Sequence, residues 1–69
     1  MTNLILIKRI LTLISQTYAL PLIELENIYN HVESVDTVLN VIDISQSERI
    51  DLNLALDVWK ENGLSRKEN

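Results

Sequence analysis

The chain has no cysteine and no phenylalanine among its 69 residues, and it has a single glycine and a single proline. The absence of cysteine excludes disulfide bonds and thiolate metal sites, and one glycine cannot form a Gly-rich loop that holds a phosphate. Basic residues number six against ten acidic ones, and they are scattered, whereas nucleic-acid binders usually carry a clustered basic face. We therefore expect no cofactor and no direct contact with nucleic acid.

Aliphatic residues are what the sequence has in abundance. Hydrophobic residues make up 46% of the chain, which is too many for a disordered protein. A chain of this length nevertheless lies near the lower limit for unaided folding, and such chains are usually reinforced by disulfides, metals or self-association. Because the absence of cysteine excludes disulfides and thiolate metal sites, the composition predicts self-association: a homo-oligomer, a dimer or higher. A further protein partner is also possible.

Residues 4–14 are the most hydrophobic segment, with eight large aliphatic residues among eleven. Coiled as an α-helix, these residues cover about half of the circumference. We expect this helix to be the element against which the rest packs, with one flank buried in its own subunit and the other against a partner. The predicted interface consists of Leu6, Ile7, Ile10, Leu11, Leu13, Ile14 and Trp59.

The same segment is neither a secretory signal nor a membrane span. Its apolar run is interrupted by Lys8 and Arg9, and no small-residue cleavage site follows it. It is also shorter than the roughly 20 apolar residues that cross a bilayer. We therefore expect a cytoplasmic protein without membrane contact.

The first half of the chain predicts a helical hairpin. One helix is expected from about Asn3 to Gln16 or Tyr18, capped by Thr2 or Asn3. Pro21 suits the first position of a second helix, because its missing N–H would be unsatisfied there in any case. The short connection between them favours an antiparallel pair.

The second half is more ambiguous. Ser34 is a suitable N-cap for a third helix, although the β-branched residues of 38–44 leave a short strand as an alternative. Residues 45–48 read Ser-Gln-Ser-Glu, the spacing of a capping box, and predict a boundary there.

The last element carries both helix and strand signals. Apolar and polar residues alternate over 50–58, so a strand near 48–54 is possible. Asp51 is a good N-cap, however, and Gly63 stands where a left-handed C-cap belongs, with Leu64 then contacting Trp59. We predict a helix over 52–62. The fold class is an all-α bundle of three to four helices in one domain, 1–65, with a polar tail, 66–69; the alternative is α+β.

Two segments, Ile10–Pro21 and Ile50–Ser65, resemble PIN domains, the family of many bacterial toxin ribonucleases. The first ends in a Tyr-Ala-Leu-Pro turn that leads into a second helix, and the second ends in Gly-Leu-Ser, as a later PIN helix does. The resemblance implies a metal-dependent ribonuclease with three or four acids at its metal site. Leu4 and Ile5 stand where one family acid is expected, and the other positions fall outside the chain. The resemblance therefore implies a fragment or degenerate copy, inactive alone.

Other groupings carry little chemistry. His31 with Glu24 and Glu33 is the one set that suggests a metal or acid–base site, yet a single histidine without a second one at ligand spacing is more typical of a polar helix face. Ser45 and Ser47 lack a histidine base in their sequence context, and capping explains them better.

The leading functional hypothesis is a small helical module for protein–protein interaction or regulation, which self-associates and has no catalysis of its own. One alternative is the PIN-type remnant. Another is an acidic inhibitor of a nucleic-acid-binding protein, since residues 22–57 carry eight acids and the single base Arg49.

Overall fold

The structure, a computed structural model, describes the backbone of residues 4–66 and the side chains of residues 4–62. Four helices occupy this part of the chain: α1 (Leu4–Tyr18), α2 (Leu22–Val32), α3 (Val35–Glu48) and α4 (Leu52–Arg66). The all-α prediction is confirmed, and neither strand alternative forms within residues 4–66. The N-cap expected at Thr2 or Asn3 and the tail beyond Arg66 lie outside the described residues.

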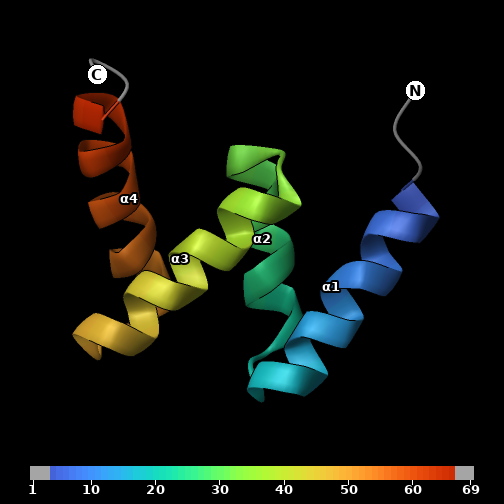
Figure 1. Ribbon diagram of the computed structural model, residues 1–69. Coiled ribbons are helices and arrows are strands. Elements are labelled where there is room, and N and C mark those ends of the chain that lie inside the picture. Colours follow the sequence, from blue (N-terminus) through green and yellow to red (C-terminus); the bar gives the residue numbers. More distant parts are fainter. Residues whose placement is uncertain (1–3, 67–69) are drawn as a thin grey trace.

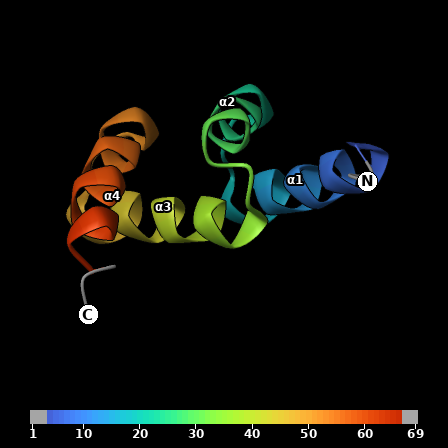
Figure 2. The same cartoon turned by 90° about the horizontal axis from the view of Figure 1, so that it is seen from above.

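The four helices form two hairpins arranged side by side in a thin layer. Figure 1 shows α1 and α2 running in opposite senses, followed by α3 and α4 doing the same. The Cα positions extend over 33 × 30 × 15 Å. Both views place α1 and α4 at opposite ends of the layer, with α2 and α3 between them (Figures 1 and 2).

The core lies between α2, α3 and α4 rather than around α1. Of its ten buried side chains, α1 contributes two, and α1 packs mainly against α2. The expectation that residues 4–14 form the central element is therefore wrong: an end helix has one neighbouring helix, so half of its wide apolar face stays outside. The buried residues are Leu11, Ile14, Leu25, Ile28, Val38, Val41, Ile42, Leu52, Ala55 and Leu56.

Side-chain oxygens begin the third and fourth helices as predicted. The backbone N–H of Thr37 donates to Ser34 Oγ at 3.3 Å, and that of Leu54 donates to Asp51 Oδ1 at 2.8 Å. Pro21 lies one position earlier than predicted: with ψ at 128° it is the N-cap of α2 rather than its first helical residue. Its extended backbone turns the chain while its carbonyl accepts hydrogen bonds from the first turn of α2.

The helices do not end at a left-handed glycine, as predicted for Gly63, but at left-handed residues of other types. Three non-glycine residues, Ala19, Glu33 and Arg49, take the left-handed conformation at the ends of α1, α2 and α3. Gly63 does not end a helix, because α4 continues through it to Arg66. The prediction of a C-cap at Gly63 is therefore wrong: glycine permits the left-handed conformation but does not impose it. The contact expected between Leu64 and Trp59 lies outside the described side chains.

Residues 45–48 form the last turn of α3 and not a capping box at the start of a helix. Ser45 ties this turn to the loop that follows. The Ile50 N–H donates to the Ser45 carbonyl at 3.1 Å, and Ser45 Oγ donates to the Ile50 carbonyl at 2.6 Å. These four residues have the spacing of a capping box, which belongs at the start of a helix, but here they lie at the end of one. The four residues alone do not distinguish the two ends.

The same arrangement occurs thirty residues earlier. The Leu20 N–H donates to the Ser15 carbonyl at 2.9 Å, and Ser15 Oγ donates to the Leu20 carbonyl. We call the Ser15–Leu20 and Ser45–Ile50 pairs the serine clasps. Each encloses a left-handed residue, Ala19 with φ 56° and Arg49 with φ 58°. The i to i+5 backbone bond is that of a Schellman motif.

The sequence around the two clasps repeats at the same offset. Residues 14–17 read Ile-Ser-Gln-Thr and residues 44–47 read Ile-Ser-Gln-Ser, and the helices that follow begin at Leu22 and Leu52. Tyr29 and Trp59 are also thirty residues apart, and both are half-buried. The two hairpins, α1–α2 and α3–α4, which we call the two hairpin units, therefore share the serine clasp, the start of the helix that follows it and a half-buried aromatic side chain.

Candidate interaction surface

The outer side of α1 exposes large aliphatic side chains to solvent. Ile5 is 76% exposed, Leu6 51% and Leu13 62%. They are exposed because α1 is the first element of the layer and its main neighbour, α2, covers only the opposite side. Contiguous apolar surface of this kind marks interaction sites in soluble proteins.

These side chains border a shallow groove of about 720 Å³ along α1, which we call the α1 groove. Its lining combines aliphatic residues with two cations, and no acid lines it. Such a surface favours a partner that offers both apolar and acidic side chains. The groove is lined by Ile5, Leu6, Lys8, Arg9, Ile10, Thr12, Leu13 and Gln16.

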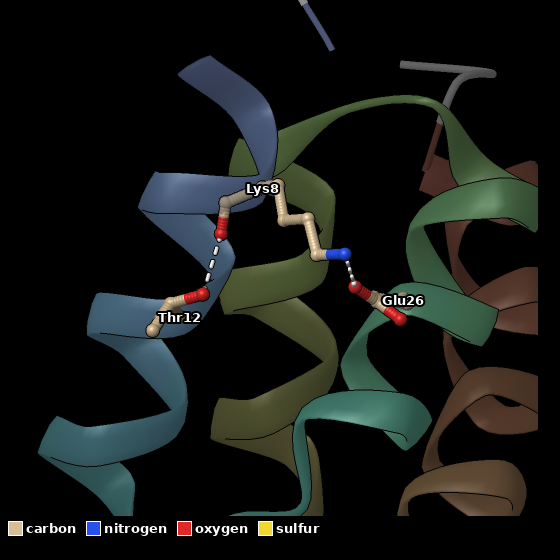
Figure 3. A network of polar contacts seen from close by, with 3 residues as sticks. All are labelled: Lys8, Thr12 and Glu26. Atoms are coloured by element: carbon tan, nitrogen blue, oxygen red, sulfur yellow. Dashed lines mark hydrogen bonds and ion pairs between the residues drawn. The ribbon is translucent and has the colours of Figure 1, made fainter. Parts of the chain in front are cut away.

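Polar contacts hold the edge of the groove nearest to α2. Lys8 Nζ lies 3.9 Å from Glu26 Oε2 on α2, and Thr12 Oγ1 donates to the Lys8 carbonyl at 2.7 Å (Figure 3). The Lys8 side chain is 69% exposed, so the ion pair is screened by water and contributes little to stability. Lys8 can therefore change partners at small cost.

The structure divides the seven predicted interface residues into three groups. Leu6 and Leu13 are exposed in the α1 groove, and the half-buried Ile10 also lines it. Leu11 and Ile14 are buried in the core of the chain itself. Ile7 and Trp59 are half-buried and pack against that core.

Sequence reasoning did not assign Ile5, Lys8 or Arg9 to this surface. The hydrophobicity pattern of residues 4–16 separates the two cations from the predicted apolar face and leaves Ile5 among polar neighbours. The groove follows instead from the position of α2. The one available indication was the repeat at Ser15 and Ser45, which pairs α1 with α3 as corresponding helices of two hairpins.

A second apolar and acidic face lies on α4 at the other end of the layer. Leu54 is 49% exposed, Val58 is half-buried, and Asp57 and Glu61 are exposed. The spacing of three, four and seven residues places them on one side of a helix. We call this set the α4 face.

Charge is distributed unevenly between these two ends. In α1 the charged residues are Lys8 and Arg9, whereas residues 22–62 carry nine acids against Arg49 and Lys60. The α1 end of the molecule and the remainder of the described chain therefore carry opposite net charges.

No known protein family, curated protein or solved structure matches the chain. Within residues 4–66, no three His, Asp or Glu side chains gather as a metal site. His31, considered above with Glu24 and Glu33, is exposed and donates from Nδ1 to the Asn27 carbonyl at 2.8 Å. None of the helices in the described range is long and apolar enough to cross a membrane.

Proposed function

We propose that this protein is a small cytoplasmic interaction module that self-associates through the α1 groove and performs no catalysis of its own. The observation that supports this function is the exposure of Ile5, Leu6 and Leu13 in the groove of one end helix. A single copy leaves these side chains in water, and a second copy can remove them from it.

The energetics favour association. Burying one large aliphatic side chain fully stabilises a structure by about 1.5–3 kcal/mol. Covering several of them would add appreciably to the stability of a 69-residue domain. Such small domains are only marginally stable, because they bury a lower fraction of their surface on folding. Self-association would therefore stabilise the folded chain as well as create the assembly.

The test is the molar mass of the protein in solution. Size-exclusion chromatography with light scattering over micromolar to millimolar concentrations should show a mass above that of one chain, rising with concentration. Leu13→Glu should shift the protein to the monomer, because it places a charge in the groove. Ile23→Glu is the matched control, since Ile23 is 66% exposed but lies on α2 and does not line the groove.

A monomeric wild-type chain across this range contradicts the proposal. So does equal association of wild type and Leu13→Glu. The thermal midpoint is a second measurement: it should rise with protein concentration for wild type and for Ile23→Glu, and stay constant for Leu13→Glu.

A further inference from the structure

The two hairpin units show which surface of α1 is left without a neighbouring unit. On α3, Ile42 is 1% exposed and Val35 packs against the core. Their counterparts thirty residues earlier are Thr12 and Ile5, which line the α1 groove, with Ile5 76% exposed. Both helices pack within their own hairpin, but α3 also packs against α2 of the preceding unit.

The side of α3 that carries Ile42 indeed faces the first unit. Ile42, Leu39 and Asp43 border a small depression together with Tyr18, at the end of α1. Ile5 and Thr12 are therefore groove residues whose counterparts on α3 are covered, whereas Asp36 and Asp43, the counterparts of Leu6 and Leu13, are exposed.

The α4 face lies at the far end of the layer from the α1 groove. Of its four residues, only Val58 has a counterpart that is covered within the chain, since Ile28 of α2 is 1% exposed. The counterparts of Leu54, Asp57 and Glu61 are Glu24, Asn27 and His31, which are exposed on α2, so the case for the α4 face rests on its own apolar and acidic side chains. In Figures 1 and 2 the groove helix α1 and the helix α4 lie at the two ends of the layer, so one chain cannot bring them together.

We propose that a second copy of this chain docks head to tail, with its α4 face in the α1 groove of the first. This inference rests on the proposed self-association and names the two surfaces that meet. Leu54 and Val58 offer apolar side chains to the groove, while Asp57 and Glu61 meet its cations. An amphipathic helix laid in an apolar groove is a common mode of recognition.

The contact joins the first helix of one copy to the last helix of another. It is heterologous, so copies add in a row or close into a ring, unlike a symmetric pair. It is also more polar than the contact within the chain, because Thr12 stands in place of Ile42 and Asn62 in place of Val32. Such an interface is reversible and weakened by salt.

Two variants block one surface each. Ile5→Glu adds a negative charge to the α1 groove, and Leu54→Glu adds one to the α4 face. Both positions are exposed in the single chain, so both variants should fold, which far-UV circular dichroism checks. Each variant alone should be monomeric by light scattering. Their equimolar mixture should give a complex of two chains and nothing larger, because one open groove and one open α4 face remain.

The outcomes separate this inference from the proposed function. If Leu54→Glu associates as wild type does while Ile5→Glu is monomeric, the grooves pair with each other: the head-to-tail contact is overturned and self-association stands. A monomeric wild type overturns both. Ile23→Glu, which touches neither surface, should associate as wild type.

A charge exchange provides a test that does not depend on blocking. Arg9→Glu and Glu61→Arg should each raise the dissociation constant several-fold, and the double variant that carries both changes in one chain should regain part of the loss, because every contact between its copies has the reversed pair of charges. Raising the salt concentration should weaken the wild-type assembly. No recovery in the double variant, with no effect of salt, overturns the charge complementarity on which the docking depends.

Discussion

Ser45 and Ile50 are joined by two hydrogen bonds that run in opposite directions, from the Ile50 N–H to the Ser45 carbonyl at 3.1 Å and from Ser45 Oγ to the Ile50 carbonyl at 2.6 Å. The side chain thereby satisfies a carbonyl just beyond the helix, and the backbone bond satisfies one inside it. Ser15 and Leu20 form the same pair in the first hairpin. Each clasp joins the last turn of one helix to the loop that leads into the next. It therefore helps to fix how the two helices of that hairpin are oriented.

The first prediction concerns the clasp hydroxyls. Ser45→Ala should be less stable than Ser47→Ala by about 1 kcal/mol, because a hydrogen bond contributes roughly that much and its loss leaves the half-buried Ile50 carbonyl without the hydroxyl. Ser47 is an exposed residue of the same turn, so both variants share the change in helix propensity. The measurement is the free energy of unfolding in urea. Equal stabilities would contradict the structural role of the clasp.

The second prediction concerns the left-handed residues. Ala19→Gly should raise the free energy of unfolding by about 1 kcal/mol, since a side chain in this conformation costs roughly 1–2 kcal/mol and glycine avoids most of that cost. Gln16→Gly is the control, because Gln16 is an exposed helical position where glycine destabilises by about 1 kcal/mol. Urea unfolding of both variants should therefore move in opposite directions. A loss of stability in Ala19→Gly would contradict the assigned conformation.

The third prediction compares two isoleucines on α2. Ile28 is 1% exposed and Ile23 is 66% exposed. Ile28→Val should lower the free energy of unfolding by about 0.5–1.5 kcal/mol, because it removes a packed methylene from the core. Ile23→Val should change it by less than about 0.5 kcal/mol. The fluorescence of Trp59 reports the transition for both. Equal losses would mean that α2 turns a different side to the core.

Helix starts were more accessible to sequence reasoning than helix ends. Ser34 and Asp51 were predicted as N-caps because a short side-chain oxygen satisfies a free N–H wherever a helix begins, which is a local property. The ends were not, because Ala19, Glu33 and Arg49 adopt the left-handed conformation without being glycine. Whether a non-glycine residue takes this conformation depends on how the next helix packs. The five or six residues around the helix end do not determine that packing.

The candidate surface was predictable in kind but not in detail. The aliphatic content of residues 4–14 correctly indicated more apolar surface than one chain covers. It did not distinguish Leu11, which is 2% exposed, from Leu13, which is 62% exposed. Both have the same side chain, and only the side on which α2 packs separates them. The repeat at Ser15 and Ser45 was present in the sequence and indicated that α1 and α3 are corresponding helices.

The last prediction uses the repeat to redesign the first hairpin. Lys8 and Glu26, paired at 3.9 Å across α1 and α2, correspond to Val38 and Leu56 in the second hairpin, which are 0% and 6% exposed. The double variant Lys8→Val with Glu26→Leu should therefore fold more stably, by about 1–3 kcal/mol, because it replaces a weak exposed ion pair with an apolar contact.

Urea unfolding of this double variant in a Leu13→Glu background, where association is expected to be blocked, isolates the effect within the chain. Arg9→Val is the control: Arg9 is the exposed neighbour on α1 that forms no ion pair with α2 in the described residues, so its removal should change stability by less than about 0.5 kcal/mol. If the double variant is less stable than wild type, positions 8 and 26 do not face each other as 38 and 56 do, and the two hairpins are not units of one design.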